Sequence, residues 1–79
     1  MKLVRATLET RNFTFDAYGV TEAQALANLN AGWHRHCDQY ERADRNLFVN
    51  LIEEIQFQSF EEGACYRDDE QIYIDPSRL

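Results

Sequence analysis

The run from His34 to Asp38 is the part of the sequence whose residue types could bind a metal ion. It reads His-Arg-His-Cys-Asp, and imidazole, thiolate and carboxylate are the groups that zinc takes as ligands. On a helix, residues two positions apart point in directions about 200° apart, so His34 and His36 cannot share one ion. His34, Cys37 and Asp38 do fall on one side, but Cys37 also belongs to an apolar stripe. The run therefore predicts histidines at the edge of a buried surface, with no bound metal or other cofactor.

The two cysteines are weak candidates for nucleophilic catalysis. A reactive thiolate needs a partly exposed, electropositive setting, whereas Cys37 is predicted to lie under a sheet. Cys65 shares a strand face with Arg67 but has no histidine near it in the sequence, and we expect both thiols to be reduced and largely buried. Phosphate-binding loops, the nucleophile elbow and the C-x-x-C motif are all missing from the sequence. We therefore predict that the protein is not an enzyme, with a metal- or thiol-dependent enzyme as the alternative.

Acidic residues are concentrated in the second half of the chain. Residues 1–39 carry 4 basic and 4 acidic side chains, and residues 40–79 carry 4 basic and 10 acidic ones, which accounts for the whole formal net charge of −6. A surface dense in carboxylates repels nucleic acid and anionic membranes and attracts basic proteins. We therefore expect a protein partner with a basic surface, and no direct binding to nucleic acid or to a membrane.

The carboxylates of the second half fall at predicted turns and strand ends, close to tyrosines. Carboxylates in such places commonly provide solubility and prevent edge pairing, while aromatic side chains beside them suit a protein interface. Neighbouring acidic residues on a strand point to opposite faces, so these pairs do not automatically converge on a catalytic site. The predicted partner-binding residues are Glu61, Glu62, Tyr66, Asp68, Asp69, Glu70 and Tyr73.

Two strands and a helix are predicted to build the core. Residues 2–9 and 12–18 alternate between apolar and polar side chains, as half-buried strands of a hairpin do. Thr21 and Gln24 form a capping box that begins a helix over residues 22–41. The inward-facing strand residues are predicted to be Val4, Ala6, Leu8, Phe13, Phe15 and Ala17, and the helix stripe to be Ala23, Leu26, Leu29, Trp33, Cys37 and Tyr40.

Shorter elements follow the helix. Residues 46–52 fit a short helical turn or an irregular segment, and residues 53–60 fit a strand. Gly63 can take a positive φ in a tight turn, after which residues 64–67 and 71–74 are short strands. If these strands form a meander, its two acidic turns lie at opposite ends and make a rim.

These elements define the fold class and a compartment. The order is β-β-α-β-β, so we predict one small α+β domain that spans the chain, with an antiparallel sheet of four to five strands packed against one long amphipathic helix. No apolar stretch approaches the roughly 20 residues that span a bilayer, and no signal-peptide core is present. Two cysteines are too few for a secreted disulfide scaffold. The prediction is a cytoplasmic protein.

The segment from Tyr18 to Leu29 resembles the strand-to-helix corner of HicB-like antitoxin domains. That resemblance implies a homodimeric regulatory domain. The HicB pattern also has a further strand before the helix and often a DNA-binding module, and neither is visible in this sequence. A small acidic β-β-α-β-β protein is also similar in outline to several phage-encoded inhibitors, anti-CRISPR proteins among them. The leading prediction is therefore a small acidic inhibitor or adaptor, encoded by a phage or mobile element, that engages a basic protein surface. A homodimeric antitoxin-like domain is the alternative.

Overall fold

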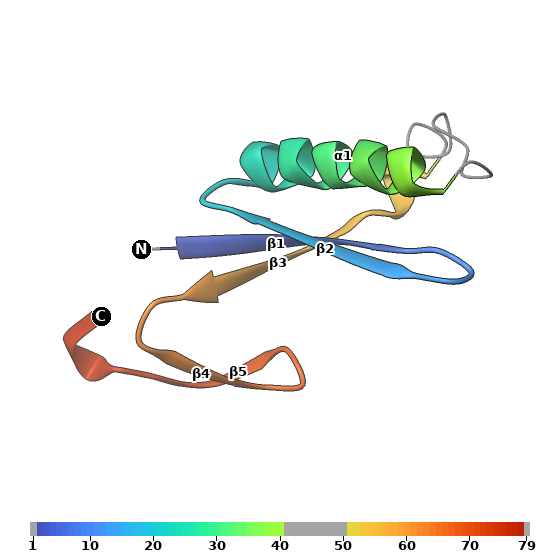
Figure 1. Ribbon diagram of the computed structural model, residues 1–79. Helices are drawn as coiled ribbons and strands as arrows, with labels where there is room; N and C mark the ends of the chain where they lie inside the picture. The colour runs from blue at the N-terminus through green and yellow to red at the C-terminus, as the bar shows by residue number, and fades with distance from the viewer. Residues whose placement is uncertain (1, 41–50, 79) are drawn as a thin grey trace.

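The computed structural model describes residues 2–40 and 51–78. It confirms the α+β class and the order β-β-α-β-β, with one helix of 18 residues. In chain order the elements are β1 (Lys2–Glu9), β2 (Thr14–Gly19), α1 (Glu22–Gln39), the 3₁₀ turn η1 (Ile52–Glu54), β3 (Gln56–Glu61), β4 (Ala64–Arg67), β5 (Glu70–Ile74) and the 3₁₀ turn η2 (Pro76–Arg78). Figure 1 shows the helix, α1, on one side of strands β1, β2 and β3, and the hairpin of β4 and β5 on the other side.

The five strands are divided between two antiparallel sheets. Strand β1 is the centre of a sheet with the order β2-β1-β3, and β4 and β5 form a separate two-stranded hairpin. Ala6 of β1 lies opposite Ala17 of β2 and Phe57 of β3. Strand β3 therefore pairs with the distant β1, and the meander considered from the sequence does not continue from β3 into β4.

Alternation along β1 buries one side of the strand, as predicted. Val4, Ala6 and Leu8 are all buried beneath the helix, together with Ala17 of β2. Phe13 faces the helix side as predicted, since its ring lies 5.1 Å from that of His36 and 5.7 Å from that of Tyr40, but it remains 45% exposed. It precedes the first residue of β2, at the end of the β1–β2 hairpin and outside the buried core cluster, so its ring is covered on one side only.

Helix α1 begins at the predicted capping box. The Gln24 backbone N–H donates to Thr21 Oγ1 at 3.1 Å, and the Val20 N–H donates to Gln24 Oε1 at 2.6 Å. These bonds satisfy donors that a helix start would otherwise leave unpaired. The helix ends at Gln39, two residues before the predicted end, with Tyr40 as its C-cap.

The buried face of α1 is rotated slightly from the predicted stripe. Its buried residues are Ala25, Leu29, Trp33 and Cys37, and the helix lies over β2 and β1. Leu26 is partly buried against this core, as predicted, whereas Ala23 and Tyr40 are exposed and were wrongly included. Ala25 is buried because the helix starts tightly against β2. A Cβ added to Gly19 would lie 2.7 Å from the Ala25 nitrogen, so only glycine fits this approach.

The segment after α1 differs from its prediction in one respect. Residues 46–50 of the predicted helical or irregular segment lie outside the described residues. Strand β3 begins at residue 56 rather than 53, because the Glu54 N–H donates to the Leu51 carbonyl and closes a 3₁₀ turn. Ile55 then enters the core as a buried residue.

The two turns of the C-terminal region have distinct backbone conformations. Gly63 has a φ of 84°, as the predicted tight turn requires. Asp68 and Asp69 have φ values of 49° and 67°, which is the left-handed pair that a two-residue hairpin turn of type I′ needs. Because these two residues complete the turn, β5 begins at Glu70 rather than at residue 71.

Candidate functional site

The C-terminal hairpin is attached to the face of the three-stranded sheet opposite α1. Arg5 lies on this face, since its alternate neighbours on β1 are buried under the helix. Its Nη2 donates to Asp69 Oδ2 at 2.9 Å, and Gln58 Nε2 donates to the Asp69 carbonyl oxygen at 3.1 Å. The Arg5 guanidinium also lies 5.1 Å from the ring centroid of Phe60. The hairpin turn is thus held against β1 and β3 through both the side chain and the backbone of Asp69.

Arg5 is the electrostatic centre of this attachment. Its Nε lies 3.7 Å from Asp16 Oδ1, and the Thr7 hydroxyl donates to the same carboxylate oxygen at 2.7 Å. The hydrogen bond to Asp69 raises the pKa of Arg5 above its ordinary value, helped by the charges of Asp69 and Asp16 and opposed by burial. Arg5 is therefore charged at neutral pH and compensates part of the negative charge around it.

Tyr66 forms the second attachment between the hairpin and β3. Its hydroxyl oxygen accepts from the Glu61 backbone N–H at 2.7 Å and lies 3.5 Å from the Ser59 carbonyl and 3.3 Å from Gln71 Oε1. Its ring meets the Phe60 ring edge-on, with the centroids 4.9 Å apart. Tyr66 was predicted as a partner-binding residue, and in the structure its ring and hydroxyl make contacts within the chain.

The other predicted binding residues lie on the exposed parts of the hairpin. Tyr73 is 56% exposed on β5, directly opposite Cys65. Asp68 and Glu70 are exposed at the β4–β5 turn, and Glu61 and Glu62 are exposed at the turn before β4. The two acidic groups are separated by the length of β4, about 13 Å for its four residues. They form a rim at the two ends of the hairpin, and Tyr73 lies between these ends because it pairs with Cys65 of β4.

Ile72 is an exposed hairpin residue that the sequence reasoning missed. It is 48% exposed, although alternation with Tyr73 would turn one of the two residues inward. The pairing of β4 with β5 shifts between Cys65 and Tyr66, so that Ile72 is an extra residue on β5. Such a bulge changes the direction in which side chains point. The hairpin therefore presents two adjacent exposed apolar side chains.

Charge on this part of the chain is strongly one-sided. Residues 51–77 carry eight acidic side chains and one basic one, Arg67. Of the eight, Asp69 has its carboxylate paired with Arg5 of the N-terminal sheet. The acidic character predicted from the sequence is therefore concentrated on η1, the two turns and the strands of the C-terminal region.

The groups considered for metal or thiol chemistry do not converge. Among residues 2–40 and 51–78, no three or more His, Cys, Asp or Glu side chains are placed to hold a metal ion. Cys37 is buried and Cys65 is exposed, so the expectation of two buried thiols is wrong for Cys65. The β4 side chains alternate, and Cys65 is on the side that points away from the half-buried Ala64 and Tyr66.

His36 belongs to an aromatic cluster at the C-terminal end of α1. Its ring lies 5.2 Å from Trp33 and 4.7 Å from Tyr40, measured between centroids. Phe13 and Phe15 approach the same imidazole from the β1–β2 hairpin, at 5.1 Å and 5.0 Å. His36 thus packs at the edge of the buried helix face, where the sequence placed it, and the cluster explains the position of the exposed Phe13.

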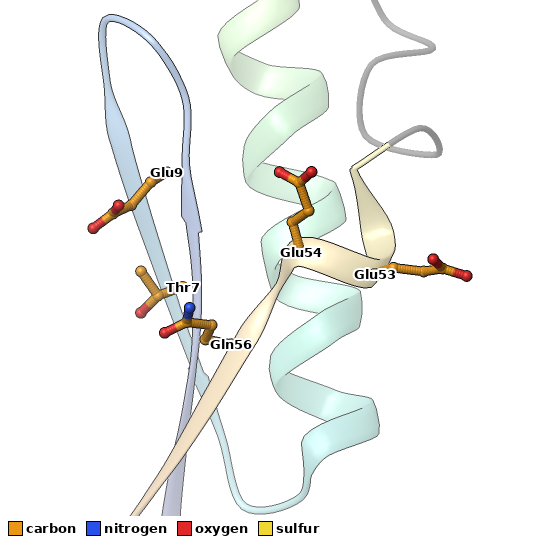
Figure 2. Close-up of a pocket in the computed structure, with 5 residues that line it drawn as sticks. All are labelled: Thr7, Glu9, Glu53, Glu54 and Gln56. Atoms are coloured by element: carbon orange, nitrogen blue, oxygen red, sulfur yellow. The ribbon is translucent and has the colours of Figure 1, made fainter.

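An open depression of about 430 Å³ lies beside the N-terminal end of β3. It is lined by Thr7, Glu9, Glu53, Glu54 and Gln56. Figure 2 shows that Glu53 and Glu54 point in different directions, and that Glu9 lies on the far side of the depression. Three carboxylates therefore border this depression, one from β1 and two from η1.

Comparison with known proteins assigns no family to this fold. No protein-family model, curated protein or solved structure matched the chain. Within the described part of the chain, no helix combines the length and apolar character needed to cross a membrane.

Proposed function

We propose that this protein is a non-enzymatic protein-binding module whose C-terminal hairpin engages a basic surface of another protein. The observation that carries the proposal is the exposure of Tyr73 and Ile72 between two acidic turns. Interfaces commonly combine a few apolar or aromatic anchors with a polar rim. The hairpin offers this combination, and its carboxylates favour a partner of opposite charge.

Two predicted residues take a different place in this proposal. Asp69 is paired with Arg5, and Tyr66 is bonded to β3, so both fix the hairpin in position. The partner-binding set is then Glu61, Glu62, Asp68, Glu70 and Tyr73, with Ile72 added.

A basic protein surface of this kind often binds nucleic acid, because lysine and arginine neutralise phosphates. A protein that covers such a surface acts as an inhibitor or adaptor. The carboxylates would accelerate the encounter, and Tyr73 and Ile72 would slow dissociation by burying apolar area. An origin in a phage or mobile element fits this role and stays part of the proposal.

The test compares two variants of equal net charge. Asp68→Asn/Glu70→Gln/Tyr73→Ala alters the hairpin, and Glu22→Gln/Asp38→Asn alters α1; each removes two carboxylates and changes the formal charge from −6 to −4. Each protein is used to capture partners from an extract of the cells that encode it, over a range of salt concentrations. We expect the wild type and the α1 variant to capture the same basic protein, with retention falling as salt rises.

The hairpin variant should lose this capture. Equal capture by the hairpin variant and the wild type would contradict the proposal, and so would capture that is insensitive to salt. Far-UV circular dichroism and a thermal melt of both variants provide the control for folding, since the substituted side chains are all exposed.

A further inference from the structure

Strand β3 leaves one edge of the three-stranded sheet open. Within the described residues, β3 pairs with β1 on one side and with no strand on the other. Natural edge strands are usually protected by charges, proline or bulges. Residues 56–60 carry no charge and no proline, and Glu61 is the only charged residue of the strand. Phe57 is 38% exposed beside this edge. An uncharged edge with an exposed aromatic residue is suited to pairing with another strand.

The hydrogen bond of Tyr66 identifies which backbone groups point toward the open edge. Because the Glu61 N–H donates to Tyr66 rather than to β1, the backbone of Glu61 points away from β1. Alternate residues of an antiparallel strand point to the same side, so the N–H and C=O of Ser59 and Phe57 also point away. Tyr66 lies against the C-terminal part of this edge, near the Ser59 carbonyl. No residue within 2–40 or 51–78 is seen to bond to the Phe57 N–H, the Phe57 C=O or the Ser59 N–H, and these three groups are available to a partner strand.

The opposite edge of the sheet is less suited to strand addition. The Tyr18 carbonyl of β2 accepts from Asn28 Nδ2 of α1 at 2.8 Å, so the helix covers one end of that edge. Asp16 places a charge in the middle of β2. Charged residues on natural edge strands prevent pairing with other strands, so Asp16 disfavours strand addition at β2.

Acidic residues flank the open edge of β3 at both ends. Glu53 and Glu54 precede the strand, and together with Glu9 they border the depression of Figure 2. At the other end are Glu61, which lies opposite Lys2 on β1, and Glu62. A strand that pairs with residues 57–59 would bring its own ends beside these carboxylates.

We infer that the open edge of β3 binds an extended segment of the partner by strand addition, and that this segment has an uncharged centre with lysine or arginine at both ends. Backbone hydrogen bonds supply the pairing in this mode of recognition, and the flanking side chains supply specificity. The inference rests on the proposed function, because it takes the partner to be a basic protein. A second copy of the chain is the wrong occupant: antiparallel pairing of two β3 strands would place Glu53 and Glu54 beside Glu61 and Glu62 of the other copy, and like charges facing each other are destabilising.

The test uses synthetic peptides with the full-length protein. The probe is Arg-Lys-Thr-Val-Thr-Val-Lys-Arg carrying a fluorescent label, and binding is measured by fluorescence anisotropy. Each of two control peptides changes one part of the probe. The first keeps the centre and has glutamate at the four end positions. The second keeps the ends and has N-methylated amides in the Thr-Val-Thr-Val centre. We expect each control to bind at least roughly tenfold more weakly, since one loses charge complementarity and the other loses ladder hydrogen bonds.

Amide hydrogen exchange locates the peptide. We expect the Phe57 and Ser59 amides to exchange rapidly in the free protein and to become protected with the probe, while the Gln58 amide, directed toward β1, stays protected throughout. Equal binding of the N-methylated peptide would overturn the inference. Protection at Asp16 and Tyr18 of β2 in place of β3, or a stable dimer of the free protein with Phe57 and Ser59 already protected, would also overturn it.

Two variants separate this inference from the proposed function. Each of two variants removes two carboxylates, and Glu53→Gln/Glu54→Gln should weaken binding of the probe more than the hairpin variant Asp68→Asn/Glu70→Gln/Tyr73→Ala, whose turn is held beside β3 through Asp69. If only the hairpin variant weakens binding of the probe, the β3 inference fails while the proposed hairpin surface stands. If the probe binds as expected but the hairpin variant still captures the basic partner, the proposed hairpin surface fails instead.

Discussion

A double-mutant cycle between Arg5 and Asp69 measures how firmly the hairpin is attached to the sheet. Asp69→Asn removes the charge but keeps a residue type that tolerates the left-handed backbone of this turn, and it leaves the carbonyl that accepts from Gln58. Arg5→Met removes the guanidinium but keeps a long side chain that can lie against Phe60. The coupling energy between the two substitutions therefore reports the ion pair itself.

The structure sets the expected size of this coupling. At the 2.9 Å separation of Nη2 and Oδ2, Coulomb's law gives about 1.4 kcal/mol in a medium with the dielectric constant of water, about 80. The Arg5 and Asp69 side chains are 23% and 56% exposed, so ordering them in water offsets part of this energy. We expect a coupling of about 0.5–1 kcal/mol, within the range measured for exposed pairs.

Urea denaturation of the wild type, both single variants and the double variant gives this coupling. The series is repeated in 1 M salt, where the Debye length falls to about 3 Å from about 8 Å at physiological ionic strength, and the coupling should become smaller. A coupling indistinguishable from zero at low salt, or one unchanged in 1 M salt, would show that the Arg5–Asp69 pair does not hold the hairpin.

Three further predictions concern the elements that support the hairpin surface. Leu8→Ala should lower the free energy of unfolding by about 2–5 kcal/mol because Leu8 is fully buried, and Leu3→Ala, at an exposed site on the same strand, should cost far less; chemical denaturation compares them. Thr21→Ala should cost about 1 kcal/mol by removing the N-cap hydrogen bond of α1, and a thermal melt no lower than that of the wild type would refute this. Tyr66→Phe should cost about 1 kcal/mol and should accelerate exchange of the Glu61 amide, which would stay slow if the hydroxyl were not its acceptor.

The elements near the N-terminus could be predicted because local patterns determine them. Alternation over β1 identified Val4, Ala6 and Leu8 as core residues, and the Thr21 capping box fixed the start of α1. Spacing of three and four residues left the exact rotation of the helix open, since several apolar stripes overlap. The tight approach of Ala25 to Gly19 decides it, and this contact depends on how the helix turns back onto the sheet.

Features that depend on distant pairing could not be predicted. The pairing of β3 with β1 and the separation of the β4–β5 hairpin require contacts between residues far apart in the sequence. The Arg5–Asp69 ion pair spans 64 positions, so Asp69 could be recognised as acidic but not as already paired. In the same way, the sequence identifies Tyr66 as an aromatic residue near carboxylates. The hydrogen bond from the Glu61 N–H to its hydroxyl could not be predicted, because it depends on how the hairpin folds back onto β3.

Site-specific photo-crosslinking identifies the molecule that the hairpin contacts in the cell. A photoreactive p-benzoylphenylalanine replaces Tyr73 on the hairpin or, as the matched control, Ala31 on the exposed face of α1, and each full-length protein is irradiated in the cells that encode it. We expect position 73 to crosslink to a basic protein and position 31 to give no such crosslink. Equal crosslinking from both positions, or crosslinks from position 73 only to nucleic acid or to another copy of this chain, would contradict it.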